Sequence, residues 1–559
     1  MPRCFNRTLS SGRRIAGQKV AAIVPNPRFT ISISGRWAAI RIAFPPEISD
    51  FLQTRHRAKQ SEVANRSELD SNVLDWLTPP SMEERIIVDA QSPATAFPHF
   101  WEHMFGSCHA SVALCEDWRK DLRALREIVD VKYVRFHGIF EHQAGIYGGQ
   151  DAAGNLVLNF TRIDLIYDGL LEIGVYPFVE LGFMPEEIAA RPSPHPFWYH
   201  PNVAPPRDPR HWYQLVFQFA RHLVERYGIE RVADWYFEVW NEPNIDFWTG
   251  EPKEETYYDL YDLAASALKD VSPRLRVGGP ATAQAAWIDR FIRHCVEKNV
   301  PVDFVSTHVY PNDTALNVFG TEENIPQSDM VALAVRKVYQ QVIASGRPEL
   351  PIIWTEYNAG FDAVQLDSPY VGPWLANNIR LCTGGFATEM SYWTFTDAFF
   401  EEGGVFKSVF CSGFGLIATG RIPKASFNAF KILHYLGDQQ LALDSTLALL
   451  TRRSGDGAVV LALWNYIPPR ESGRCITVNL QLRGLKKNQE RAKIFLVDDD
   501  HGSPLKSWQA MGRPDFPSLE QQAALRKAAV LPPPLSAKLV DGQLSVSLQP
   551  DALAVIEFS

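Results

Sequence analysis

From Ile86 onward, short apolar runs alternate with longer segments in which apolar residues recur every three or four positions. Short apolar runs predict buried strands, and the 3.6-residue spacing predicts amphipathic helices. Single helical faces collect Trp118, Leu122, Leu125 and Val129 in one segment and Trp212, Val216, Phe219 and Leu223 in another. The expected strands are Phe100–Phe105, Val131–Phe136, Val175–Leu181, Trp235–Trp240, Leu275–Val277, Phe304–Thr307, Ile352–Trp354 and Met390–Thr394.

Eight strands that alternate with helices over ~300 residues are typical of the α/β class and suit a closed (β/α)₈ barrel. We place this barrel at residues 84–435. The structural alternative is an open, doubly wound sheet. Such a sheet normally carries a Gly-x-Gly-x-x-Gly turn after its first strand, and this chain has none there.

The pattern changes after Leu436, where strand-like runs follow one another without helical segments between them. These runs are Leu447–Thr451, Ala458–Trp464, Cys475–Leu480, Lys493–Val497, Leu544–Leu548 and Ala554–Phe558. They predict an accessory β-sandwich over residues 436–559, which the strand Glu84–Asp89 is expected to join. Residues 1–83 show no sustained period, so we expect a peripheral or poorly ordered extension.

Composition narrows the range of partners. A net charge of −9 over 559 residues argues against a large basic face for nucleic acid, and no apolar run is long enough to cross a bilayer. The seven cysteines are scattered and odd in number, which indicates free thiols, and the N-terminus is a poor signal peptide. We therefore expect a cytoplasmic protein, or a periplasmic or secreted one if the true N-terminus differs. The sequence does not indicate an oligomeric state.

Two predicted strands end in glutamates. The fourth strand ends in Asn241-Glu242-Pro243-Asn244, and the seventh delivers Glu356 within Ile352-Ile-Trp-Thr-Glu-Tyr-Asn358. The carboxyl ends of barrel strands face the active-site mouth, so both side chains are expected to converge there. Two carboxyl groups about 5–5.5 Å apart perform retaining glycoside hydrolysis, one as acid/base and one as nucleophile. Either glutamate alone could be a polar turn or a surface ion-pair residue.

This chemistry needs only two carboxylates and water, so we expect no cofactor and no metal, and a small oligosaccharide or glycoside as partner. The chain shows neither a phosphate-binding loop nor a ligand cluster with metal spacing. Glu180 lies inside an apolar strand. We interpret it as a structural partner, for instance of Arg135, rather than as a catalyst.

Several further motifs follow the same order as in a known family. They are Arg135–Phe140, Tyr176–Pro185, Trp240–Asn244, Ser306–Pro311, Trp354–Asn358, Tyr392–Asp397 and Gly413–Leu416. With these motifs the chain resembles glycoside hydrolase family 39, which contains β-xylosidases and α-L-iduronidases. The resemblance extends from about Ile86 to the C-terminus and leaves only the N-terminal extension unmatched.

The resemblance implies a role for each matching position. Glu242 matches the family's acid/base and Glu356 its nucleophile, while Asn241 would bond the sugar 2-hydroxyl. The residues expected to line the sugar subsite or to lie under the ring are His137, His308, Tyr310 and Trp393. Glu401 and Glu402 resemble an acidic pair that holds sugar hydroxyls, but the spacing from Trp393 is one residue longer, so either could do so. The histidines and Trp393 could also be ordinary barrel core.

Aromatic residues suggest how the mouth is shaped. The segments Phe197–His200 and Phe247–Trp248 follow the third and fourth strands and could wall the mouth into a pocket that admits one terminal sugar. We therefore predict an exo-acting retaining β-xylosidase that releases xylose from xylo-oligosaccharides. The alternatives are another glycone within the family (iduronide, galactoside, glucoside or arabinoside) and a catalytically silent carbohydrate-binding barrel. The latter is disfavoured, because a buried carboxyl without a task is costly.

Overall fold

A computed structural model describes residues 82–361, 365–398, 408–486 and 489–558. Glu401 and Glu402 lie outside the described residues, as does most of the predicted N-terminal extension. Residues 81–559 form a single compact unit. The predicted boundary at residue 436 therefore stays a prediction, although two kinds of sheet occur on its two sides.

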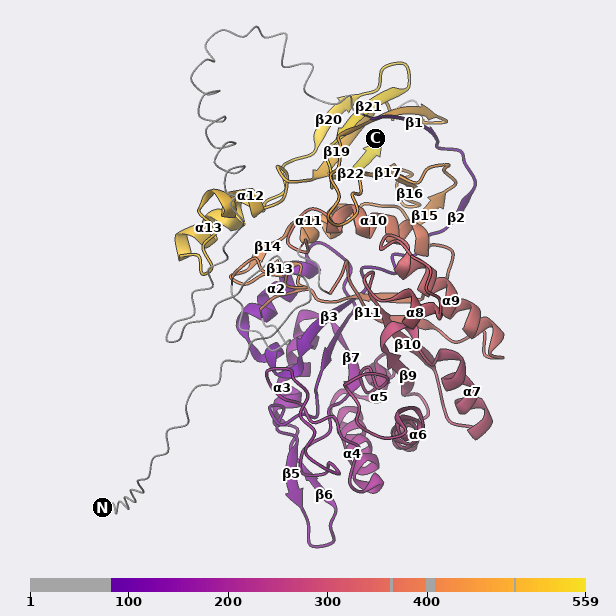
Figure 1. Cartoon of the computed structure of the whole chain (residues 1–559), viewed down its shortest axis with the longest axis vertical. Coiled ribbons are helices and arrows are strands. Elements are labelled where there is room, and N and C mark those ends of the chain that lie inside the picture. Colours follow the sequence, from indigo (N-terminus) through magenta and orange to yellow (C-terminus); the bar gives the residue numbers. More distant parts are fainter. Residues whose placement is uncertain (1–81, 362–364, 399–407, 487–488, 559) are drawn as a thin grey trace, which may run out of the picture. The chain divides into compact units, whose positions relative to one another are not determined.

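Eight parallel strands close into a barrel in sequence order (Figure 1), which confirms the predicted fold. The strands are β3 (Met104–His109), β4 (Tyr133–His137), β7 (Tyr176–Leu181), β8 (Tyr236–Val239), β9 (Arg276–Thr282), β10 (Phe304–Val309), β11 (Ile352–Tyr357) and β12 (Glu389–Tyr392). Every predicted strand is present. The first strand begins four residues later than predicted. Phe100 and Trp101 are buried, as in a strand, but they precede it in the chain.

Each barrel strand is followed by a helix. These helices are α2 (Glu116–Arg126), α3 (Thr161–Ile173), α4 (Pro209–Tyr227), α6 (Lys253–Val271), α7 (Ile288–Lys298), α9 (Met330–Ala344), α10 (Val371–Cys382) and α11 (Ala425–Leu433). Helix α4 has local signals at both ends: the Asp208 side chain accepts from the Arg210 backbone N–H, Pro209 opens the first turn, and Gly228 follows the last. The predicted face of α2 is buried. Its last predicted member, Val129, is buried too, but it lies beyond the end of the helix.

The C-terminal strands form two sheets. The larger has the order β2 (Ala94–Ala96), β15 (Gln439–Leu441), β16 (Ala448–Arg452), β17 (Val459–Trp464), β22 (Leu553–Phe558), β19 (Arg491–Val497) and β20 (Leu535–Lys538). The smaller has the order β1 (Met82–Asp89), β18 (Ile476–Arg483) and β21 (Gln543–Leu548). Strand β1 pairs with β18 in parallel, so the prediction that Glu84–Asp89 joins the C-terminal strands is confirmed.

The burial pattern explains how these sheets pack. Strands β18 and β21 alternate buried and more exposed residues, as expected for a sheet with one solvated face. Strands β17 and β22 are buried on both faces. One face shares a core with the smaller sheet through residues such as Leu461 and Val478, and the other joins the barrel core through Val460 and Val555. The larger sheet is thus the middle layer between barrel helices and small sheet.

Two helices interrupt the C-terminal strands between β19 and β20: α12 (Leu505–Ala510) and α13 (Leu519–Ala528). The sequence pattern predicted only strands in this region, without helices between them. Helix α13 begins with a capping box, in which Ser518 and Gln521 bond each other's backbone N–H groups.

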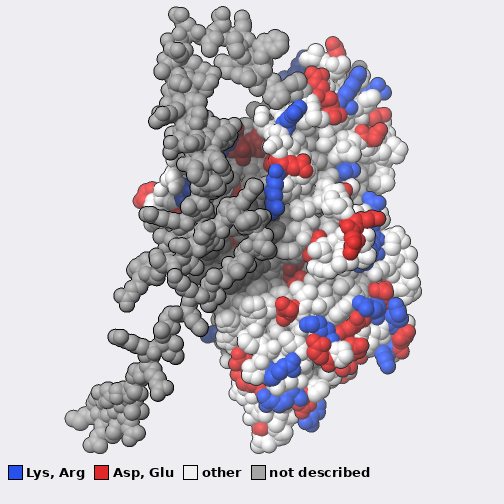
Figure 2. All heavy atoms as spheres, in the orientation of Figure 1, with Lys and Arg blue, Asp and Glu red and all other residues white. Residues whose placement is uncertain are grey.

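Among the described residues, helices with the length and apolarity needed to span a bilayer are absent. On the face in Figure 2, positive and negative side chains are intermingled.

Candidate active site

A cavity of about 540 Å³ opens at the carboxyl ends of the barrel strands. Its described lining comes from strand ends and from the loops that follow them, and it is mainly aromatic and carboxylic. The lining residues are Cys108, His137, His195, Pro196, Phe197, Asn241, Glu242, Ile245, Phe247, Ala283, Gln284, Tyr310, Asp313, Glu356, Phe361, Trp393, Thr394, Asp397 and Phe414. Both predicted glutamates lie within this set.

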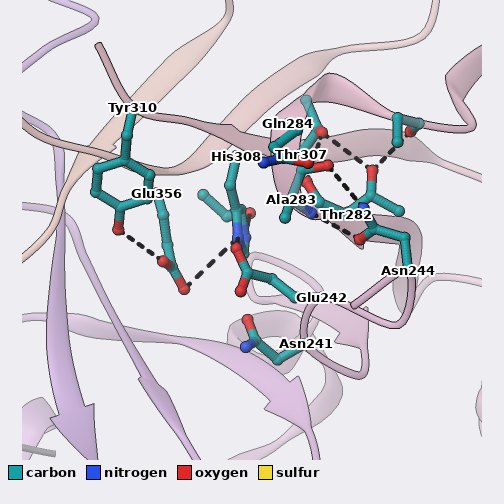
Figure 3. A network of polar contacts seen from close by, with 12 residues as sticks. Asn241, Glu242, Asn244, Thr282, Ala283, Gln284, Thr307, His308, Tyr310 and Glu356 are labelled. Atoms are coloured by element: carbon teal, nitrogen blue, oxygen red, sulfur yellow. Dashed lines mark hydrogen bonds and ion pairs between the residues drawn. The ribbon is translucent and has the colours of Figure 1, made fainter. Parts of the chain in front are cut away.

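Glu242 sits on a tight turn directly after β8. Trp240 and Glu242 both have left-handed backbone conformations, with φ of 71° and 43°. Residues other than glycine rarely adopt this conformation. The turn is held from outside: the Glu242 N–H donates to Ala281 O at 2.8 Å, and the Asn244 side chain bonds both backbone groups of Ala283 (Figure 3). The support fixes the direction in which the Glu242 carboxyl points.

Glu356 is part of β11 itself, and hydrogen-bond donors converge on its two oxygens. Arg135 Nη1 lies 2.8 Å from Oε1, and the Tyr310 hydroxyl donates to Oε2 at 2.9 Å (Figure 3 shows the Tyr310 contact). Charge-assisted bonds of this kind are short and strong, and they hold the orientation of the carboxyl group. A carboxylate held in this way is suited to nucleophilic attack.

The two glutamates are close neighbours in space although 114 positions separate them in the chain. A carboxylate oxygen of Glu242, a ring nitrogen of His308 and a carboxylate oxygen of Glu356 lie within 4.8 Å of one another. This separation fits the ~5–5.5 Å spacing of retaining glycosidases and is shorter than the ~6.5–9.5 Å of inverting ones. The convergence predicted from the strand ends is therefore present.

Arg135 on β4 connects the groups beneath the cavity. Its guanidinium is fully buried and forms ion pairs with Glu180 at 3.0 Å and Glu238 at 2.6 Å, besides the contact with Glu356. It also donates to Asn241 Oδ1 at 2.9 Å. Because Arg135 occupies the Asn241 amide oxygen, the amide NH2 group remains as the donor for a bond to a sugar hydroxyl. The interpretation of Glu180 as a structural partner of Arg135 is confirmed.

A second chain of hydrogen bonds fixes where protons reside. Thr355 donates its hydroxyl hydrogen to Glu238 Oε1 at 2.8 Å, so at 3.0 Å it accepts from His308 Nε2. Burial lowers the pKa of His308 to about 4, so near neutral pH the ring carries one proton, on Nε2. His308 Nδ1 is then an acceptor, 2.9 Å from Glu242 Oε1.

An acceptor at this position implies that Glu242 carries a proton. Burial, opposed by the charge of Arg135 and reinforced by Glu180, raises the pKa of Glu242 to about 7. The hydrogen-bond pattern and the raised pKa thus both favour the neutral form of Glu242. A neutral carboxyl can donate a proton to a leaving group, which is the behaviour of a general acid.

His137 and Trp393 form the base of the cavity. The His137 ring lies 4.7 Å from that of Trp393, and its Nε2 lies 3.6 Å from Glu356 Oε1. Gly106 on β3 makes room for the indole, because a Cβ there would lie 2.2 Å from Trp393 Cε3. The flat indole beside the reacting carboxylates suits stacking against a sugar ring.

The structure brings Asn241, Glu242, His308, Tyr310 and Glu356 together (Figure 3), with His137 and Trp393 beside them. The aromatic wall was only partly predicted. Phe197 and Phe247 line the cavity, whereas Trp248 is fully buried and packs on Trp240.

Five polar lining residues were not predicted from the sequence, namely His195, Gln284, Asp313, Thr394 and Asp397. Gln284 and Asp313 each follow closely after a barrel strand, a position that could have identified them.

The trio Glu242, His308 and Glu356 could in principle hold a metal ion. The charge of Arg135, 2.8 Å from Glu356 Oε1, disfavours a divalent cation at the same place. The arrangement fits two-carboxylate chemistry better.

Comparison with known proteins agrees with this geometry. Residues 84–536 match the model of Glycosyl hydrolases family 39. A β-xylosidase of Caldicellulosiruptor saccharolyticus is 37% identical over 453 residues, 77% of this chain and 88% of that one. A β-xylosidase of Geobacillus stearothermophilus is 35% identical, covering 82% and 93% of the two chains. A crystal structure of a monomeric β-xylosidase from Caulobacter crescentus superposes with a TM-score of 0.76 at 29% identity, covering 85% and 99%. The chain belongs to glycosyl hydrolases family 39.

Proposed function

We propose that this enzyme is a retaining, exo-acting β-xylosidase in which Glu242 is the acid/base and Glu356 the nucleophile. The observation that carries the proposal is the pair of carboxyl groups, of which one oxygen each lies within 4.8 Å of the other. His308 contacts Glu242, and Arg135 holds Glu356. The xylosidase names of the 35–37% identical relatives support the choice of glycone.

The reaction proceeds in two displacements. In the first, Glu242 gives its proton to the glycosidic oxygen while a Glu356 oxygen attacks the anomeric carbon. The bond to the leaving group breaks, and a covalent glycosyl ester forms. In the second, the Glu242 carboxylate takes a proton from water as the water oxygen attacks the same carbon. The ester bond breaks, xylose leaves with its original anomeric configuration, and Glu242 is protonated again.

The described lining favours a neutral sugar. Among the described lining residues there is no lysine or arginine, and a uronide would require a cation for its carboxylate. Aromatic side chains Phe197, Phe247 and Phe361 surround the opening instead. These residues suit a short, uncharged glycone in a pocket.

A panel of nitrophenyl glycosides, with product anomers followed by NMR, tests glycone and stereochemistry together. We expect the largest kcat/KM on the β-xyloside and β-xylose as the first product. Xylobiose should be cleaved faster than long xylan. Faster cleavage inside the polymer, or a first product of inverted configuration, would contradict the proposal.

A further inference from the structure

A second polar cluster lies at the amino-terminal end of the barrel, remote from the active site. It consists of His99 and Glu102, just ahead of β3, and His434, just after α11. We refer to these three residues as the junction cluster. They come from opposite ends of the barrel sequence and meet where the chain leaves α11 for the larger C-terminal sheet.

The junction cluster has the geometry of a metal-ligand set. Glu102 Oε1 lies 2.8 Å from His99 Nδ1 and 3.0 Å from His434 Nδ1, and all three ligand atoms lie within 4.8 Å of one another. Tetrahedral zinc with bonds of ~2.0–2.2 Å separates its ligand atoms by about 3.3 Å. Small movements of the side chains would therefore place all three around one ion.

The two ring nitrogens of His99 face different partners. Its Nδ1 lies 2.8 Å from Glu102 Oε1, and its Nε2 lies 3.3 Å from the Gly437 carbonyl oxygen. Metal-bound histidines typically contact a backbone carbonyl or carboxylate through the ring nitrogen that does not bind the metal. The contact with Gly437 leaves His99 Nδ1 as the ligand atom inside the cluster.

The space and the charge around the junction cluster suit a bound cation. It borders a surface cavity of about 640 Å³, in which Asp130, Asp438 and Asp456 add negative charge and Arg453 the opposite charge. The cavity leaves room for water as a fourth ligand. Glu102 is nearly buried, with its side chain 2% exposed, while His434 is 43% exposed, so an ion could enter from solvent.

We propose that the junction cluster binds one divalent transition-metal ion of the zinc type, with three protein ligands and water. The ion would tie the segment before β3 to the segment after α11. The short strands β2 and β15, which pair with each other, connect to these segments. The expected consequence is a more stable junction between barrel and C-terminal sheet, with no part in the chemistry at the other end of the barrel.

The test uses the full chain after treatment with a chelator. Zn²⁺ alone is titrated by calorimetry, and thermal unfolding is measured over the same Zn²⁺ concentrations. His434→Gln removes one ligand, and His501→Gln is the matched control, because His501 is 39% exposed and also bonds a carboxylate, that of Asp498. His99→Gln is the second variant, so that the outcome does not depend on one mutant folding well.

We expect one zinc per chain and an unfolding temperature that rises with Zn²⁺ in the wild type and in His501→Gln. Both junction variants should bind Zn²⁺ at least about tenfold more weakly and lose the temperature shift, while kcat on a nitrophenyl xyloside is unchanged. Zinc binding that is absent in the wild type, or retained in both junction variants, would overturn the proposal. Neither result depends on the identity of the glycosidase substrate.

Discussion

Two layers of side chains inside the barrel differ sharply, although they lie on the same strands. The lower layer is an apolar cluster of Met104, Phe178, Phe304 and Ile353, with Tyr133 and Tyr236 packed against it. Two positions further along the same strands, the residues are Gly106, Arg135, Glu180, Glu238, Ser306 and Thr355. Within one strand period the interior changes from packed hydrocarbon to a charged network.

The difference shows how one scaffold combines stability with chemistry. The lower layer removes apolar surface from water and needs no specific orientation. In the upper layer, each buried charge depends on a partner, since an unpaired buried charge is strongly destabilising. Substitutions in the lower layer should therefore act mainly on the free energy of unfolding, whereas those in the upper layer should also lower kcat or change its pH dependence.

The largest effect is expected for Glu356→Ala, above the upper layer. Loss of the nucleophile should reduce kcat by at least about 10⁴-fold, with little change in the unfolding temperature. Steady-state kinetics on a nitrophenyl β-xyloside and a thermal melt measure both quantities. A variant that keeps a tenth of the wild-type kcat would exclude the assigned role.

Glu242→Ala should show a loss that depends on the leaving group. On substrates with poor leaving groups kcat should fall by about 10²–10⁴-fold, the usual contribution of a general acid. Activated aryl xylosides should keep far more of their rate, and a small anion such as azide should restore turnover by attacking the glycosyl ester. If Glu356→Ala showed this pattern instead, the two roles would have to be exchanged.

The contrast between the layers can be tested on one strand. Phe178→Ala should lower the free energy of unfolding by about 3–5 kcal/mol and leave kcat of the folded enzyme close to wild type. Glu180→Gln, two residues further on, should reduce kcat/KM more, because it removes a charge partner of Arg135. Chemical denaturation and kinetics on both variants give the comparison. The account is contradicted if both variants change only the free energy of unfolding.

The smallest effect is a shift in pH dependence. Glu242 must be protonated to act as acid, so kcat/KM should fall as pH rises through about 7, the pKa of its carboxyl. In Thr355→Val, His308 loses the acceptor at Nε2 and can carry its proton on Nδ1 instead. That proton stabilises the Glu242 carboxylate, so the descending limb should move to lower pH by on the order of one unit.

Thr451→Val is the control, because Thr451 is buried and hydrogen-bonded in the C-terminal sheet. Its pH profile should match that of the wild type. An unshifted limb in Thr355→Val would show that the hydrogen-bond chain does not set the protonation of Glu242.

Much of this arrangement could be predicted from local patterns. The barrel strands appear as apolar runs, and Glu242 and Glu356 lie at strand ends, where the direction of the chain already places them at the mouth. The pairing of Arg135 with Glu180 was predicted, but the convergence of Glu238 and Glu356 on the same guanidinium could not be predicted in this way. Its partners come from β7, β8 and β11, and only the closure of the barrel brings those strands around β4.

The C-terminal region shows the same limit. Pairing of the three-residue strand β2 with β15 joins residues more than 340 positions apart, and so short a strand leaves no period to detect. Helix α13 was missed although its capping box at Ser518 and Gln521 is a local signal. The surrounding strand-like runs outweighed it.

The identity of the nucleophile can be tested most directly by trapping the glycosyl ester. A 2-deoxy-2-fluoro-β-xyloside with an activated leaving group forms the ester rapidly and hydrolyses slowly, and peptide mass spectrometry locates the label. Glu356 and Glu242 line the same cavity, and one carboxylate oxygen of each lies within 4.8 Å of the other. The reagent can therefore reach either of them. We predict a single fluoroxylosyl group on the peptide that carries Glu356. A label on Glu242, or turnover with inversion and no label, would contradict the account.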